Sequence, residues 1–166
     1  MAPQSSARQP SNSTPDAPLI RDADEADLPR IVELLAQLSL DATRERLEEP
    51  LPASYLAAFE EIIADQRQRL LVIETQGRIA GSAVLIIVPN LSHQGRPYAI
   101  IENIVVDTAA RGAGSGETLV RYAIEEARKA GCYKLSLTSN KRRPDAHRFY
   151  ERLGFQATHE GYRLEF

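Results

Sequence analysis

The chain has 166 residues, of which 43% are hydrophobic and 26% charged, and its formal net charge is −3. This composition is typical of one globular domain, and the negative charge argues against a protein that coats nucleic acid. The longest apolar stretch, residues 83–89, is too short to cross a bilayer, and the single cysteine, Cys132, excludes an intrachain disulfide. We therefore expect neither a membrane nor a nucleic acid as partner.

Residues 1–17 are rich in serine and proline and carry almost no large apolar side chain. Such a segment buries too little apolar surface to fold, so we predict a disordered tail followed by one domain at 18–166. The tail also lacks the apolar core of a signal peptide, and we expect a cytoplasmic protein.

The periodicity of apolar residues predicts alternating strands and helices from residue 19 onward. In the first half we predict a strand at 19–21, a helix capped by Asp22 or Asp24 with an apolar stripe from Leu28 to Leu38, and a helix after Pro52. Two strands follow at 70–74 and 79–88, joined by a turn at Gln76-Gly77. The rest of the chain is predicted to form a strand at 98–107, a helix at 116–130, a strand at 133–138, a helix at 144–153, and strands at 155–158 and 162–166. This order predicts an α/β fold, a mixed central sheet with helices on both faces.

A glycine-rich turn joins the predicted central strand to the helix that follows it. The turn carries Arg111 and three glycines, Gly112, Gly114 and Gly116. The first N–H groups of a helix lack intrahelical acceptors, and glycines allow the backbone to approach a ligand closely. With Arg111 as a fixed cation, this turn is suited to a diphosphate. Neither the spacing of dinucleotide-binding loops nor the Gly-Lys-Ser/Thr of nucleoside triphosphate sites is present.

Two motifs resemble the GNAT superfamily of acetyl-CoA-dependent N-acetyltransferases. The first is Arg-x-x-Gly-x-Gly, Arg111 to Gly116, after a Val-Val-Asp strand end. The second is Phe-Tyr-Glu-Arg-Leu-Gly-Phe at 149–155, which resembles the late helix and following turn of that family. The motifs stand in the family's order, and the resemblance spans residues 18–166. It implies the GNAT fold and transfer of an acetyl group from acetyl-CoA to a primary amine.

The resemblance also implies which residues hold the coenzyme. The end of the central strand would pair its backbone with the pantetheine arm, and the amides of the turn would bind the pyrophosphate. These residues are Ile104, Val105 and Val106 on the strand, and Arg111, Gly112, Ala113, Gly114, Ser115 and Gly116 in the turn. Where the family has asparagine seven residues before the tyrosine, this chain has Arg143, and Asn140 lies three positions earlier. Asn140, Lys141, Arg142 and Arg143 remain alternatives for contacts to pantetheine or to the 3′-phosphate.

Glu102 is the candidate general base. It interrupts an apolar strand just before the turn, where an ionised carboxylate is costly unless it faces a cleft or a partner. Partial desolvation would raise its pKa towards the range that a base needs, and several small-amine acetyltransferases have a glutamate at this strand position. The alternative is a carboxylate that only binds the ammonium group of the substrate or an arginine.

Tyr150 is the candidate general acid. By resemblance, the tyrosine of the Phe-Tyr-Glu motif donates its hydroxyl proton to the coenzyme sulfur, and the alternative is an aromatic side chain that packs the late helix onto the sheet. Backbone N–H groups near Val105 and Val106 are candidates for stabilising the oxyanion. The polar pair Glu102-Asn103 is compatible with a β-bulge at this point.

The acetyl acceptor is the open question at this level. Residues 102–107 look like the corresponding strand of glucosamine-phosphate and aminoalkylphosphonate acetyltransferases, which favours a small anionic amine. The alternatives are a protein or peptide acetyltransferase and a non-catalytic acyl-CoA sensor. Cys132 has no activating motif, so we expect it to pack in the core and the amine to attack directly in a ternary complex. The three histidines lack metal-ligand spacing, so no metal is expected, and a homodimer is a further expectation because dimers are common among relatives.

Overall fold

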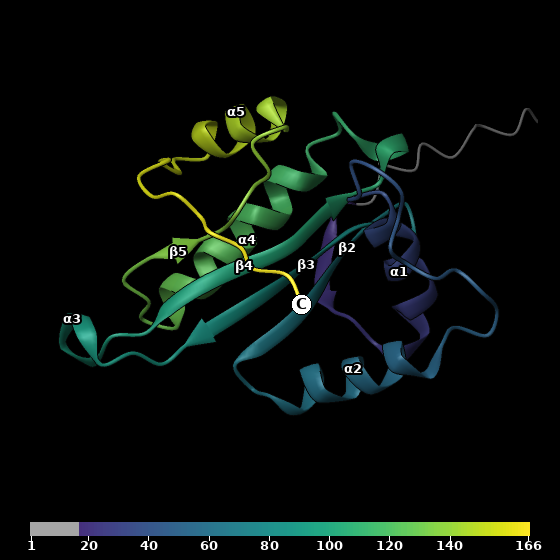
Figure 1. Ribbon diagram of the computed structural model, residues 1–166, viewed down its shortest axis with the longest axis horizontal. Helices are drawn as coiled ribbons and strands as arrows, with labels where there is room; N and C mark the ends of the chain where they lie inside the picture. The colour runs from purple at the N-terminus through teal and green to yellow at the C-terminus, as the bar shows by residue number, and fades with distance from the viewer. Residues whose placement is uncertain (1–16) are drawn as a thin grey trace, which may run out of the picture.

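The computed structural model describes residues 17–166, so the predicted disordered tail lies outside the described residues except for Ala17. One five-stranded sheet runs in the order β1-β2-β3-β4-β5 (Figure 1). The strands are β1 (Leu19–Asp22), β2 (Gln68–Thr75), β3 (Arg78–Val88), β4 (Tyr98–Val106) and β5 (Leu135–Ser136). The helices are η1 (Glu25–Asp27), α1 (Leu28–Ala36), α2 (Ala53–Ala64), α3 (Ser92–Gly95), η2 (Thr108–Ala110), α4 (Ser115–Lys129) and α5 (Pro144–Arg152).

The first four strands pair antiparallel, and β4 and β5 pair parallel. The β2–β3 connection is the tight turn predicted from the sequence: Gln76 and Gly77 both have positive φ, 53° and 70°. A two-residue turn of this kind follows the right-handed twist of its flanking strands, and glycine adopts it without steric cost. The predicted hairpin is therefore confirmed.

Alternation along the strands divides the core into two layers. Leu71 and Ile73 pack with Leu119 and Ala123 of α4 in one buried cluster. Val72 lies between them in sequence and is fully buried, so its side chain points to the opposite face. On that face, α1 contacts β3 and β4, and α2 contacts β2. Helices cover both faces of the mixed sheet, as the sequence pattern predicts (Figure 1).

Two predictions about the last third of the chain are wrong. The strand expected at 133–138 is reduced to Leu135–Ser136, and the strands expected at 155–158 and 162–166 do not form. Alternating side chains give a segment strand character, but a strand exists only where a neighbouring strand completes its hydrogen bonds. In addition, α1 ends at Ala36, before Leu38. Among residues 17–166, no helix is long and apolar enough to cross a membrane.

Candidate active site

The middle of β4 contains a β-bulge. Ser82 of β3 pairs with Val105, whereas Val84 pairs with Glu102, so two β4 residues, Asn103 and Ile104, lie opposite the single residue Ala83. Asn103 has φ of 53°, a conformation that asparagine tolerates better than most residues. The polar pair that interrupts the apolar strand is thus the place where its pairing register changes, as the sequence suggested.

Beyond the bulge, β4 has a strand neighbour on only one side within residues 17–166. Its pairing with β5 is confined to Ala99 with Leu135 and Ile100 with Ser136. On the other side, Asp107 N donates to Ala80 O at 2.8 Å, so the backbone groups of Asp107 face β3. The backbone groups of successive residues in a strand point to opposite sides. The N–H and C=O of Val106 therefore point away from β3, towards the side on which β5 no longer pairs with β4. The end of β4 therefore has backbone groups that no strand of residues 17–166 pairs.

The unpaired end of β4 leads into the glycine-rich turn at the start of α4. Gly112 and Gly114 have φ of 84° and 83°, and a Cβ at either position would meet no atom within 4 Å. These glycines are therefore required for backbone conformation and face open space rather than packed side chains. Gly114 is the N-cap of α4, whose first N–H groups have no intrahelical acceptor. Arg111 beside them is exposed.

Gly116 differs from the other two glycines of the turn. A Cβ at this position would lie 3.3 Å from Val106 Cγ2 and 3.6 Å from Phe149 Cζ. The absence of a side chain lets the first turn of α4 pack against both the end of β4 and α5. We predicted close approach to a ligand for all three glycines, and the observed neighbours of Gly116 are side chains of the protein itself.

Glu102 lies on β4 next to the bulge and is half-buried. Desolvation raises the pKa of its carboxyl above the ordinary value. Among the described residues, no group donates a hydrogen bond to this carboxylate or forms an ion pair with it. Glu102 therefore has the partly desolvated environment expected of a base, and the alternative role in which it binds an arginine of its own chain has no support here.

Tyr150 lies on α5 near Phe149 and Phe155, with ring centroids 5.2 Å and 5.9 Å away. Burial raises the pKa of its hydroxyl, the charge of Arg143 opposes that rise, and the charge of Glu102 adds to it. Glu102 of β4 and Arg143 of the loop before α5 thus both act electrostatically on Tyr150 of α5. A tyrosine with a raised pKa keeps its proton at neutral pH, as a proton donor must.

The loop before α5 has a defined internal structure. Asn140 Oδ1 accepts from Arg142 N at 2.8 Å, and Asn140 O accepts from Arg143 N at 3.0 Å. These bonds make Asn140 a turn-forming residue and occupy its side-chain oxygen. The Arg143 guanidinium donates to Leu38 O, and Arg142 pairs with Asp41 at 3.1 Å, so the segment after α1 is held against this loop.

The sequence did not indicate a further ion pair near the site. Arg30 of α1 forms an ion pair with Asp107, whose other carboxylate oxygen accepts from Ala109 N at 3.0 Å. Nearby, Gln37 Oε1 accepts from Thr108 N at 3.0 Å. The pKa of Asp107 is lowered, first by the Ala109 N–H and then by Arg30. The only sequence signal was an aspartate at a strand end, a common capping position; its partner is 77 residues away.

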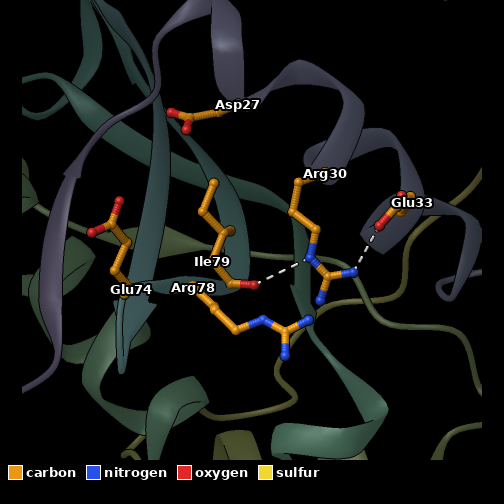
Figure 2. A pocket seen from close by; sticks show the side chains of 7 residues that line it. Asp27, Arg30, Glu33, Glu74, Arg78 and Ile79 are labelled. Atoms are coloured by element: carbon orange, nitrogen blue, oxygen red, sulfur yellow. Dashed lines mark hydrogen bonds and ion pairs between the residues drawn. The ribbon is translucent and has the colours of Figure 1, made fainter.

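Arg30 also borders a charged pocket on the far side of α1. Figure 2 shows its guanidinium between Ile79 O, 3.3 Å from Nε, and Glu33 Oε2, 2.9 Å from Nη1. The pocket is lined by Asp27, Arg30, Glu33, Glu74, Gly77, Arg78 and Ile79. A second pocket lies between α1 and residues 47–56. Neither pocket is lined by Glu102, Tyr150 or the glycine-rich turn, so the candidate active site is the open edge of β4.

Cys132 packs against the core cluster as expected, and burial raises the pKa of its thiol, against the smaller opposite effect of Arg96. Within residues 17–166 there is no group of three His, Cys, Asp or Glu side chains that could hold a metal ion.

Comparison with known proteins gives a consistent result. Residues 32–155 match the model of the acetyltransferase (GNAT) family. A glucosamine 6-phosphate N-acetyltransferase of Trypanosoma brucei brucei is 38% identical over 152 residues, which cover 88% of this chain and 94% of that protein. An aminoalkylphosphonate N-acetyltransferase of Salmonella typhimurium is 44% identical over 67 residues, 40% of this chain and 44% of that protein. Among solved structures, a Bacillus halodurans C-125 protein named a transcriptional regulator is 45% identical, with a TM-score of 0.86 and coverage of 90% of this chain and 100% of that chain.

Proposed function

The chain belongs to the acetyltransferase (GNAT) family and is an acetyl-CoA-dependent N-acetyltransferase, and from that premise we propose that its acceptor is a small primary amine that carries a phosphate or phosphonate group. The observation that carries the proposed site is the unpaired edge of β4, which runs from the bulge at Asn103 into the turn before α4. The anionic character of the acceptor is supported by the names of the two enzymes similar to this chain.

In this proposal, acetyl-CoA lies along the unpaired edge of β4. The pyrophosphate binds the free N–H groups of the turn and Arg111, because a helix N-terminus and a guanidinium both favour an anion. The pantetheine arm follows Ile104, Val105 and Val106, and the N–H of Val106 faces the thioester carbonyl, where it stabilises the oxyanion. Arg143 contributes positive charge towards the coenzyme or the acceptor, and Asn140 acts mainly by shaping the loop that presents Arg143.

The chemistry follows from the environments of Glu102 and Tyr150. Ionised Glu102 accepts a proton from the substrate ammonium, directly or through water, and the freed amine attacks the carbonyl carbon of the thioester. When the tetrahedral intermediate collapses, its positively charged nitrogen loses a second proton to water, the C–S bond breaks, and the leaving thiolate takes the hydroxyl proton of Tyr150. Proton exchange with solvent restores both side chains, and one proton is released for each amide formed.

The half-buried thiol of Cys132 supports direct attack over an acyl-enzyme, because a thiol with a raised pKa is a poor nucleophile at neutral pH. The proposal requires no metal, nucleic acid or membrane, and it places the enzyme in the cytoplasm. We also propose a homodimer, for which the exposed residues 162–166 provide a candidate surface.

A thiol-release assay with acetyl-CoA tests this proposal. The panel contains phosphorylated amino sugars, aminoalkylphosphonates, their unphosphorylated counterparts and a lysine-containing peptide. Faster turnover of the phosphorylated amines supports the proposal, whereas preference for the peptide identifies a protein acetyltransferase. If no amine is acetylated while calorimetry still detects binding of coenzyme A, the chain is an acyl-CoA sensor and the proposed acceptor is wrong.

A further inference from the structure

The pocket between α1 and residues 47–56 has a largely apolar lining. Its volume is about 550 Å³, which lies within the range of small-molecule sites. Leu28 of α1, Leu56 of α2 and Leu47 of the segment between them all line it. Leu47 is 52% exposed, so apolar surface in this pocket still faces water. Covering that surface is favourable, and the pocket is therefore suited to a ligand with an apolar chain or ring.

The charged side chains in this lining are all glutamates: Glu25, Glu33, Glu48 and Glu49. Two of them have partners outside the lining, since Arg30 pairs with Glu33 at 2.9 Å and Arg46 pairs with Glu48 at 2.8 Å. Within residues 17–166, Glu25 and Glu49 form no ion pair, and both are exposed. The pocket therefore combines an apolar lining with an excess of negative charge.

We propose that this pocket binds a small amphiphilic cation, a molecule that carries an ammonium group on an apolar chain or ring. The apolar part lies against the leucine side chains, and the ammonium group donates to Glu25 or Glu49. A hydrogen bond from an ammonium group to a carboxylate is charge-assisted, so it fixes the orientation of the ligand in the pocket. The two glutamates without an ion pair of their own gain most from such a bond.

The lining is held in place before a ligand binds. Tyr55 Oη donates to Glu45 at 2.8 Å and accepts from Arg46 N at 3.0 Å, so this aromatic residue is tied to the segment just before Leu47. Three prolines also line the pocket: Pro29, Pro50 and Pro52. The ring of a proline fixes its φ. A site that is already ordered loses little conformational freedom on binding, which favours affinity.

The charge and the lining argue against other ligands. An anion, such as the phosphate-bearing acceptor proposed for the active site, would meet four carboxylates and no lining cation among the described residues. A metal ion would gain nothing from the leucines, and residues 17–166 hold no group of three His, Cys, Asp or Glu side chains that could bind one. Glu102, Tyr150 and the glycine-rich turn do not line this pocket, so its ligand is neither acetyl-CoA nor the acceptor.

Titration of the isotope-labelled full chain by NMR, without acetyl-CoA, tests the site. The probe is N,N-dimethylhexylamine, which is cationic at pH 7, keeps one N–H and cannot form an amide. It is expected to shift the amide signals of α1 and of residues 47–56, with a Kd on the order of 1 mM. Hexanoate and hexanol share its chain, and trimethylamine shares its charge. Each of these three is expected to bind about fivefold or more weakly, because it lacks one of the two features that the pocket recognises.

Two variants test the charge and the apolar lining separately. Glu25→Gln/Glu49→Gln is expected to weaken binding of the probe about threefold to tenfold, through loss of the charge-assisted bond. Glu60→Gln/Glu61→Gln is the matched control, because it removes the same charge from exposed positions of α2 that do not line the pocket. Leu47→Ala is expected to weaken binding about threefold, through loss of apolar contact. All these positions are exposed, so each variant is expected to fold, and circular dichroism checks that it does.

Several outcomes would overturn the proposal. If hexanoate or hexanol binds as well as the probe, the charge plays no part, and if trimethylamine does, the apolar chain plays none. Shifts confined to β4 and the glycine-rich turn, no shifts at concentrations well above the expected Kd, or equal effects of the two double variants would also contradict it. None of these outcomes depends on turnover, so a failure here leaves the proposed function unaffected.

Discussion

Arg30 and Asp107 form an ion pair that joins the first helix to the end of the central strand. Asp107 also caps η2 through Ala109 N, and Arg30 also binds the carbonyl of Ile79. The pair thus holds the backbone that leads into the glycine-rich turn, with α1 and β3 as its supports. Neither side chain belongs to the proposed chemistry, so the pair is expected to act by positioning the coenzyme turn.

Arg30→Met is therefore expected to raise KM for acetyl-CoA on the order of threefold to tenfold while kcat changes little, because the turn loses a support but not a reacting group. Steady-state kinetics at saturating amine measures both constants. Arg78→Met is the matched control, because Arg78 lines the same pocket as Arg30 and has no ion pair within residues 17–166. Equal effects of the two variants would contradict a positioning role for Arg30.

Glu102→Gln is expected to lower kcat by about 10²–10³, the usual range for loss of a general base, with binding of coenzyme A unchanged. In the wild-type enzyme, activity is expected to fall at acid pH as Glu102 becomes protonated, and the raised pKa of Glu102 should move that fall to higher pH. The pH profile of kcat/KM should lose this acid limb in the variant. If the limb persists, another group is the base.

The same substitution is expected to stabilise the fold at neutral pH. Desolvation raises the pKa of Glu102 in the folded state, so between the two pKa values the folded chain holds more protons than the unfolded chain. Folding stability then decreases as pH rises from the unfolded pKa through the folded pKa. Glutamine removes this penalty, and thermal melting at pH 7 should show a higher Tm for Glu102→Gln, with the difference disappearing in acid.

Tyr150→Phe is expected to lower kcat by about 10² through loss of the proton donor to the thiolate, with little change in Tm, because the ring contacts with Phe149 and Phe155 remain. Tyr162→Phe is the matched control, since Tyr162 is 92% exposed and far from this role. Single-turnover kinetics separates the chemical step from product release. An unchanged chemical step would assign Tyr150 to packing alone.

Gly114→Val is expected to weaken binding of coenzyme A in calorimetry and to destabilise the fold by about 1–3 kcal/mol, because valine at φ of 83° is strained. Gly95→Val introduces similar strain at φ of 76°, also in open space, at the end of α3 and away from the turn. The two variants should lose comparable stability, but only Gly114→Val should lose affinity. Unchanged affinity would contradict the assignment of the turn.

The sequence was most informative where one short segment determines its own conformation. The Gln76-Gly77 turn, the glycine-rich turn and the amphipathic pattern of α4 depend on neighbours within a few residues, and all were predicted close to their observed positions. The polar pair Glu102-Asn103 was compatible with a bulge, but the sequence alone did not establish one, because a bulge is defined by the pairing of β4 with β3.

Features that depend on distant partners were not predictable in this way. Residues 162–166 have a strand pattern, yet strand formation depends on which backbone lies next to them. The Arg30–Asp107 pair joins residues far apart in the chain, and nothing near Arg30 in sequence indicates its partner. The electrostatic influence of Glu102 and Arg143 on Tyr150 likewise arises only when three separate elements meet.

The narrow space beside Gly116 limits which residues can replace this glycine. The first turn of α4 lies against both the strand proposed to carry the thioester and the helix that carries Tyr150, and a Cβ at Gly116 would lie 3.3 Å from Val106 Cγ2 and 3.6 Å from Phe149 Cζ. A methyl group there would touch one residue of each element, and Val106 would have to shift by a few tenths of an ångström to make room. A position that belongs to neither reacting group is thus packed against the supports of both.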